Sequence, residues 1–283
     1  ERTLPFLFAH QLQQAGITLN YDGDYGVLQR RVKNDEELEH LRAVQKITEA
    51  TMEMACSLIG RSPADAEGVL QHEGAALTSE RVRQLISRFV LDHDCTTLHD
   101  SIVVTVPHVA DCHHFGTGPL HKDLPVIVDI FPTHNHTHYC GDCTRTVVNG
   151  DVSDIVRDMH ACVVRANAAG CAALQPGTTG QAVHEAVAAV IREGGYSMGA
   201  PTSEKDEEWI GMRHGTGHGI GLDVHEPILL ATGGGEILER EVFTVEPGLY
   251  SAIHGGVRVE DMVAVTATGH ENFNQLHSEL NWR

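Results

Sequence analysis

The sequence lacks a hydrophobic run long enough to form a transmembrane helix, since no stretch approaches the roughly 20 apolar residues that such a helix requires. The apolar segment LPFLFA at residues 4–9 is too short for a signal peptide. Basic residues are also scarce, because 20 Lys and Arg stand against 39 Asp and Glu and give a formal net charge of -19. Such a protein repels nucleic-acid phosphates and anionic membranes, so we expect neither as a partner.

Cysteine occurs without the spacing of a disulfide framework, and its count of seven is odd. We therefore expect reduced thiols and a cytoplasmic location. Histidine, by contrast, is abundant: the chain has 20, and neutral imidazole is the commonest metal ligand among side chains. The acidic excess and the histidines together favour a metal-binding protein.

Helical patterns dominate the first part of the chain. A long helix is expected from Asn34, because Asn34 can cap it and Glu37 completes a capping box. Further helices are expected from Ser62-Pro63 and from Thr78. We interpret residues 1–33 as a connecting segment without chemistry, and residues 34–283 as the catalytic domain.

The remainder alternates strand-like and helical segments. Alanine-rich helices are expected over about 151–169 and 178–194. β-Branched runs bounded by turn residues predict strands at 101–106, 125–131, 144–148, 241–246 and 257–265. Helices that alternate with hairpin-like strand pairs indicate an α+β fold with a mainly antiparallel sheet.

Four carboxylates occupy matching places in two predicted hairpins. Asp129 lies in the apolar strand PVIVDIF, and Asp142 heads the next strand. Glu246 in FTVEPGLY and Glu260 in GVRVED repeat this arrangement. Carboxylates on adjacent strands repel one another unless cations neutralise them. The pattern therefore predicts two divalent ions, with manganese first and cobalt or zinc as alternatives.

The segment HGTGHGIGLDVHE at residues 214–226 combines glycine with histidine. Alternating glycines let an extended backbone pack closely while one histidine projects toward a metal. A zincin helix is excluded because Gly215 stands where HExxH requires glutamate. Phosphate-binding patterns are also absent from this segment, because neither GxGxxG nor GxxxxGK[ST] is satisfied.

Together, these motifs resemble the metallopeptidases of the pita-bread fold, which include methionine aminopeptidase, prolidase and Xaa-Pro aminopeptidase. The resemblance covers about residues 34–277 and implies a pseudo-twofold antiparallel sheet flanked by helices. It further implies that Asp142 and Glu260 bridge both ions. The implied ligands are Asp129, Asp142, His218, Glu246 and Glu260.

Other residues receive roles from the same resemblance. His225 matches a histidine near the scissile carbonyl, and His113 matches one upstream of the first ligand, although His114 beside it offers a second alignment. His214 matches a substrate-pocket histidine of the Xaa-Pro branch. Arg258 belongs to the GVR sequence of that branch, so it either orients the carboxylates or reaches substrate. The structural alternative is that Arg258 only pairs with a neighbouring acid, as strand arginines commonly do.

The implied function is a dinuclear metal-dependent exopeptidase that cleaves Xaa-Pro bonds with a metal-bridging hydroxide. In this hypothesis Glu246 carries the proton to the leaving nitrogen and His225 donates to the oxyanion. The substrate partner is a peptide, and a homodimer is left open. Methionine aminopeptidase is the main alternative, creatinase chemistry a further one, and an inactive pita-bread binding module the alternative of another class. Xaa-Pro members also carry an N-terminal domain, of which residues 1–33 would be a remnant.

Two local features leave alternatives open. The segment between Asp129 and Asp142 is longer than the usual family form, and its histidines 134, 136 and 138 alternate. We expect a solvated hairpin tip there, with a third metal site as the alternative. Cys140 and Cys143 form a CxxC, which we interpret as packing residues and not as a zinc knuckle or redox pair, because no second CxxC exists.

Overall fold

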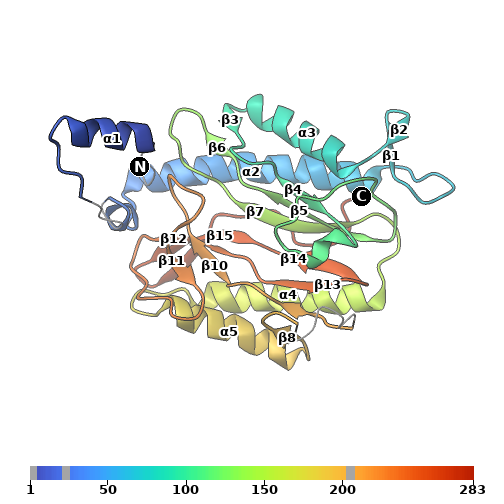
Figure 1. Cartoon of the computed structure of the whole chain (residues 1–283). Coiled ribbons are helices and arrows are strands. Elements are labelled where there is room, and N and C mark those ends of the chain that lie inside the picture. Colours follow the sequence, from blue (N-terminus) through green and yellow to red (C-terminus); the bar gives the residue numbers. More distant parts are fainter. Residues whose placement is uncertain (1–4, 21–25, 202–207) are drawn as a thin grey trace.

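The computed structural model describes residues 5–20, 26–201 and 208–283. Figure 1 shows helices α2 and α3 on one side of the β-sheets and α4 and α5 on the other. The helices are α1 (Phe6–Gln14), α2 (Asp35–Arg61), α3 (Ser79–Leu91), α4 (Asp154–Ala173) and α5 (Gly180–Glu193), with short 3-10 helices at Leu28–Arg30 and His108–Ala110. Within the described ranges, none of these helices combines the length and apolarity needed to cross a membrane.

The strands form three main sheets and two short strand pairs. The sheet orders are β4-β5-β7, β11-β10-β12-β15-β16 and β14-β13-β9-β8, with β1-β2 and β3-β6 as the pairs. All named strand pairs are antiparallel except β8 with β9, which agrees with the predicted α+β class. The strands are β1 (Gln71–His72), β2 (Ala75–Ala76), β3 (Cys95–Thr96), β4 (Ile102–Val104), β5 (Pro125–Ile130), β6 (Thr133–His134), β7 (Cys143–Val148), β8 (Ser197–Met198), β9 (Gly211–Met212), β10 (Gly217–Gly219), β11 (Glu226–Leu230), β12 (Val242–Val245), β13 (Gly248–Ser251), β14 (Gly255–Arg258), β15 (Asp261–Thr266) and β16 (Gly269–Asn272).

Helix α2 begins as the sequence predicts. The Asn34 side chain accepts a hydrogen bond from the Glu37 N–H, and the Glu37 carboxylate accepts one from the Asn34 N–H. Thr78 caps α3 in the same manner through the Arg81 N–H. Both caps satisfy N–H groups that a helix N-terminus leaves without partners.

The helix expected from Ser62-Pro63 is wrong. Ser62 is the extended C-cap of α2, and the chain continues into a β-bridge between Ala64 and Leu70. The Asp65 carboxylate accepts hydrogen bonds from the Glu67 and Val69 N–H groups. The Asp65 side chain thus satisfies backbone N–H groups in a turn, so these groups do not require helical hydrogen bonds.

The single strand expected over residues 257–265 is also wrong. Its residues divide between β14 and β15, which belong to different sheets. Between them the Glu260 N–H donates to Thr144 O on β7 at 3.1 Å, so the chain turns toward β7. Arg258, Glu260 and Met262 therefore do not share one face of a continuous strand.

The hydrophobic core has a main cluster on each side of the sheets. One packs α2 and α3 on β5 and β7 around Met52, Ile86 and Val128. The other packs α4 and α5 on β13 and β14 around Val163 and Leu249. The two clusters hold the sheets between helical layers, and the candidate site is built on strands of these sheets.

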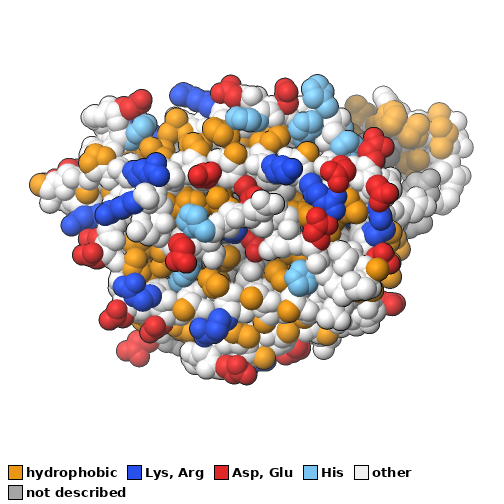
Figure 2. Space-filling view, turned by 180° about the vertical axis from the view of Figure 1, so that it is seen from behind, with side chains coloured by type: hydrophobic (Ala, Val, Ile, Leu, Met, Phe, Trp, Pro, Cys, Tyr) orange, Lys and Arg blue, Asp and Glu red, His pale blue; other side chains and the backbone are white. Residues whose placement is uncertain are grey.

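The segment before α2 contains an exposed helix and a buried part. Helix α1 has no buried residue, and Figure 2 shows hydrophobic side chains on the projecting end that holds it. Val27 and Lys33, by contrast, are buried against the body of the protein. The division of the chain at residue 33 remains a proposal.

Candidate metal centre

The first pair of carboxylates lies on neighbouring strands. Strand β5 pairs with β7 so that Asp129 faces Thr144, and Asp142 directly precedes β7. Both Asp129 and Asp142 are buried. The expected strand, reversal and second strand are thus present and bring the two side chains to one end of the sheet.

Gln45 of helix α2 hydrogen-bonds to both the C=O and the N–H of Asp142 and so fixes its backbone. The Gln45 side-chain amide donates to Asp142 O at 2.7 Å, and its oxygen accepts from Asp142 N–H at 3.0 Å. Gly141 allows this approach, because a Cβ there would lie 2.2 Å from Thr48 Oγ1. Sequence reasoning missed Gln45, since its target is far away along the chain.

The second pair of carboxylates flanks a strand pairing. Val245 of β12 faces Asp261 of β15, with Glu246 after the first residue and Glu260 before the second. Strands β13 and β14 form a separate hairpin inserted between them. Thr144 Oγ1 donates to Glu260 Oε2 at 2.6 Å, which joins the second pair of acids to the first.

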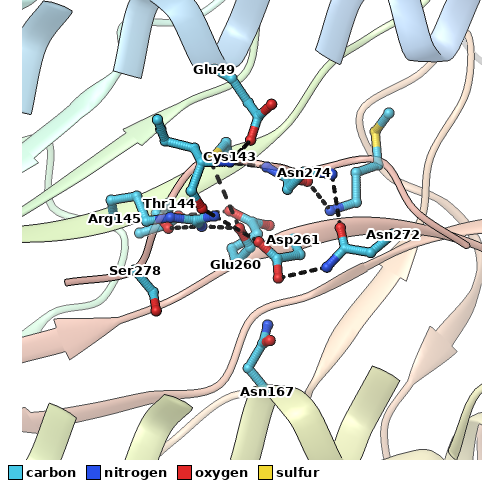
Figure 3. A network of polar contacts seen from close by, with 12 residues as sticks. Glu49, Cys143, Thr144, Arg145, Asn167, Glu260, Asp261, Asn272, Asn274 and Ser278 are labelled. Atoms are coloured by element: carbon cyan, nitrogen blue, oxygen red, sulfur yellow. Dashed lines mark hydrogen bonds and ion pairs between the residues drawn. The ribbon is translucent and has the colours of Figure 1, made fainter. Parts of the chain in front are cut away.

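A buried arginine holds the backbone at Glu260. Figure 3 shows the network, in which Arg145 donates to Glu260 O at 2.6 Å and pairs with Asp261 at 2.8 Å. Asn272 donates to the other oxygen of Asp261. Because Arg145 and Asp261 are buried and hydrogen-bonded, the Glu260 side chain starts from a fixed backbone.

His218 is placed on β10 by close backbone packing. A Cβ at Gly217 would lie 1.9 Å from Thr244 O, so only glycine permits this contact. His218 Nε2 lies 3.5 Å from Glu246 Oε1 and 3.9 Å from Asp142 Oδ2. Its Nδ1–H donates to Gly219 O at 3.1 Å, which leaves the Nε2 lone pair directed toward the acids.

Without a bound cation, the crowding of carboxylates in the cluster is electrostatically unfavourable. Burial, together with the neighbouring carboxylates, raises the pKa of Asp142 and of Glu260 well above the usual range. Burial also raises the pKa of Glu246 to about 8 and lowers the pKa of His218 to about 3. Ligand atoms of Asp142, His218 and Glu260 lie within 4.8 Å of one another. A neutral imidazole among crowded carboxylates is a donor set for divalent cations.

Only one of the two carboxylate oxygens of Asp129 has a hydrogen-bond partner. Its Oδ2 accepts from Arg258 Nη2 at 2.6 Å, whereas its Oδ1 is buried and has no hydrogen-bond partner. Buried polar atoms are normally satisfied, so Oδ1 is available to a further ligand. Arg258 therefore contacts a core carboxylate, which fits both an orienting role and a simple ion pair with a neighbouring acid.

Arg258 is also the first residue of a chain of hydrogen bonds that ends at His214. Its Nη1 donates to the Tyr250 hydroxyl at 2.9 Å, and this hydroxyl lies 2.7 Å from His214 Nε2. His214 Nδ1 donates to Gly215 O, and burial lowers the pKa of His214 to about 3. Tyr250 is buried on β13 and was missed, because a strand tyrosine gives no sequence signal of such a contact.

The two remaining candidate histidines lie at the exposed side of the cluster. The His225 ring centroid is 4.3 Å from that of His218. Burial lowers the pKa of His225, and the nearby His113 lowers it further. His114 instead stacks on His108 at 4.4 Å and accepts from Gly116 N–H. His113 is therefore the histidine of this loop that lies near His225.

The hairpin tip and the CxxC do not add a metal site. Among the residues that the structure describes, histidines 134, 136 and 138 do not form a group of converging ligand atoms, and His134 Nδ1 contacts Thr137. Cys140 and Cys143 are buried and contact Leu222 O and Glu260 O, respectively. These contacts agree with the interpretation of both cysteines as packing residues.

Comparisons with known proteins find similar peptidases. The chain is similar to an uncharacterized peptidase from Staphylococcus haemolyticus, at 28% identity over 86% of this chain and 62% of the relative. It thus spans less than two thirds of that relative's length. It is also similar to the crystallised Xaa-Pro dipeptidase from Bacillus anthracis, at 27% identity over 96% of this chain and 76% of the other, with a TM-score of 0.76.

The fold is shared more widely. An X-Pro aminopeptidase from Thermotoga maritima superposes with a TM-score of 0.80 at 24% identity, over 98% of this chain and 72% of the other. This likeness confirms the pita-bread architecture. The model of metallopeptidase family M24 matches residues 39–267. The chain therefore belongs to metallopeptidase family M24.

Proposed function

We propose that the protein is a dinuclear metal-dependent exopeptidase that cleaves Xaa-Pro bonds, as an aminopeptidase or a dipeptidase. The observation that carries the proposal is the convergence of the His218 imidazole with the carboxylates of Asp142, Glu246 and Glu260, beside a buried Asp129 whose Oδ1 has no partner. The proposed ligands are Asp129, Asp142, His218, Glu246 and Glu260, with manganese as the first metal to test and cobalt and zinc next.

The residues present fit two divalent ions. The His218 Nε2 lone pair faces the acids, Asp129 Oδ1 has no partner, and the raised pKa values of Asp142 and Glu260 show that these side chains lack neutralising charge. Bound ions of this class lower the pKa of a shared water and polarise the substrate carbonyl. Asp142 and Glu260 would contribute to holding both ions, as the family resemblance implies.

The protein side chains would then move and hold protons. Glu246 accepts a proton at its carboxylate and passes it to the leaving nitrogen, a role that its position beside His218 in the cluster allows. His225 donates to the developing oxyanion, and His113 orients the substrate from its neighbouring loop. His214 and Arg258 shape the substrate pocket through their shared contact with Tyr250.

The preference for proline rests on two observations. The GVR sequence at Arg258 and the position of His214 are those of the Xaa-Pro branch, and a crystallised relative at 27% identity carries the name Xaa-Pro dipeptidase. A cytoplasmic location is also part of the proposal, supported by seven cysteines that are all free.

The test is a substrate panel on purified protein with added manganese or cobalt. Gly-Pro and a longer Xaa-Pro peptide should be cleaved, whereas Met-Ala-Ser should not. Elemental analysis should find two divalent ions per chain. Cleavage of Met-Ala-Ser alone would replace the proposal with methionine aminopeptidase activity, and absence of both metal and turnover would favour a binding module.

A further inference from the structure

Lys33 is a buried cation at the start of helix α2. Only 3% of its side chain is exposed, and its Nζ lies 3.2 Å from Glu226 Oε2. The Glu226 side chain has no exposed surface. Removing two charges from water is costly, so such a pair persists only where hydrogen bonds and geometry compensate. Sequence reasoning assigned no chemistry to residues 1–33, and Lys33 is the exception that the structure reveals.

The partner of Lys33 organises the loop between β10 and β11. Glu226 Oε1 accepts from the Leu222 N–H at 3.1 Å and from the Asp223 N–H at 3.4 Å. A Cβ at Gly221 would lie 2.6 Å from Glu226 Oε2, so glycine makes room for the carboxylate. The loop of residues 220–225 is thus wrapped around one buried side chain.

This loop joins two residues of the proposed site. His218 lies on β10, which precedes the loop, and His225 is the last residue of the loop, directly before Glu226. His225 is exposed apart from the part of its ring that contacts His218, so its position depends mainly on the loop backbone. Arg30 reinforces the same loop through Asp223 at 2.8 Å.

We infer that Lys33 is a positioning residue for catalysis: through Glu226 it holds the loop that places the His225 ring beside His218. The inference rests on the proposed function for the role of His225. Lys33 itself touches neither the carboxylate cluster nor the histidine rings in any contact of the described residues.

The same segment provides a matched control. Arg31 forms an ion pair with Glu241, which precedes β12 and, among the described residues, makes no hydrogen bond or ion pair with residues 220–225. Arg31→Met therefore removes a cation from the same segment without loosening the loop. Lys33→Met keeps most of the length of the side chain but leaves Glu226 without its closest cation. The double variant Lys33→Met/Glu226→Gln removes both charges and is the version to measure if Lys33→Met does not fold.

The first experiment does not need an active enzyme. Hydrogen exchange of metal-loaded protein should show faster exchange in residues 220–225 for Lys33→Met, and for the double variant, than for wild type and Arg31→Met. Exchange in β14, which pairs with β13 and is not hydrogen-bonded to residues 220–225 within the described ranges, should be unchanged. Equal protection of residues 220–225 in all four proteins would overturn the inference, whether or not the proposed peptidase activity is found.

The second experiment uses the Xaa-Pro substrate that wild type cleaves. Lys33→Met should lower kcat by roughly 10- to 100-fold with little change in KM, because small misplacement of a catalytic group has effects of this size. In a His225→Ala background the same change should have no further effect on kcat. An equal loss in both backgrounds would show a general structural role and would refute positioning of His225. Failure of wild type to cleave any peptide would refute the proposed function alone.

Discussion

Replacing Asp142 with asparagine should have opposite effects on thermal stability in the absence and presence of metal. Asp142 is buried, and its carboxylate lies within 4.8 Å of the Glu260 ligand atom. Two unit charges at this distance repel by about 3 kcal/mol at an effective dielectric constant of about 20. Protonation relieves part of this repulsion, because the pKa values of both groups are raised.

In metal-free protein, Asp142→Asn should therefore increase the free energy of unfolding by about 1 kcal/mol, or raise Tm by roughly 2–4 °C. With metal at one hundred times its Kd, wild type should gain about 2.7 kcal/mol, or roughly 5–10 °C in Tm, because the ions bind only the folded state. The variant should lose most of this gain, since it lacks one proposed bridging ligand.

The assay is thermal unfolding after chelator treatment, with and without added manganese. Asp158→Asn is the control, because Asp158 is an exposed acid on α4 and should change neither value. A lower Tm for metal-free Asp142→Asn, or a metal-induced rise equal to that of wild type, would refute the electrostatic account of the cluster.

Three further predictions concern separate parts of the structure. Glu246→Gln should lower kcat by roughly 100-fold or more while the protein stays folded, because it removes the proposed proton carrier; turnover near the wild-type rate would exclude that role. Gln45→Met should cost about 2–4 kcal/mol in urea unfolding, because it leaves two buried backbone groups of Asp142 without partners, and unchanged stability would contradict this. Asn34→Ala should cost about 1 kcal/mol in the same assay through loss of the capping box, whereas an equal midpoint would show that the cap is dispensable.

Local sequence patterns determined much of the secondary structure and the identity of the candidate metal donors. The Asn34 capping box and the Thr78 cap depend on residues within one helical turn, so the sequence contains all the necessary information. The glycines around His218 likewise indicate close backbone packing, because this pattern also lies within a short stretch of sequence. Matched acids in two strand pairs, together with the family resemblance, indicated which side chains would meet.

Only the tertiary structure decided the features that depend on distant partners. The break between β14 and β15 is fixed by Thr144 O, and Tyr250 gains its position from Arg258 and His214. Lys33 and Glu226 lie 193 positions apart in sequence, and their contact became visible only after folding. The sequence by itself determined the donor types and the elements that carry them, because these depend on neighbouring residues. The shape of the site depended on packing between remote segments, which no local pattern encodes.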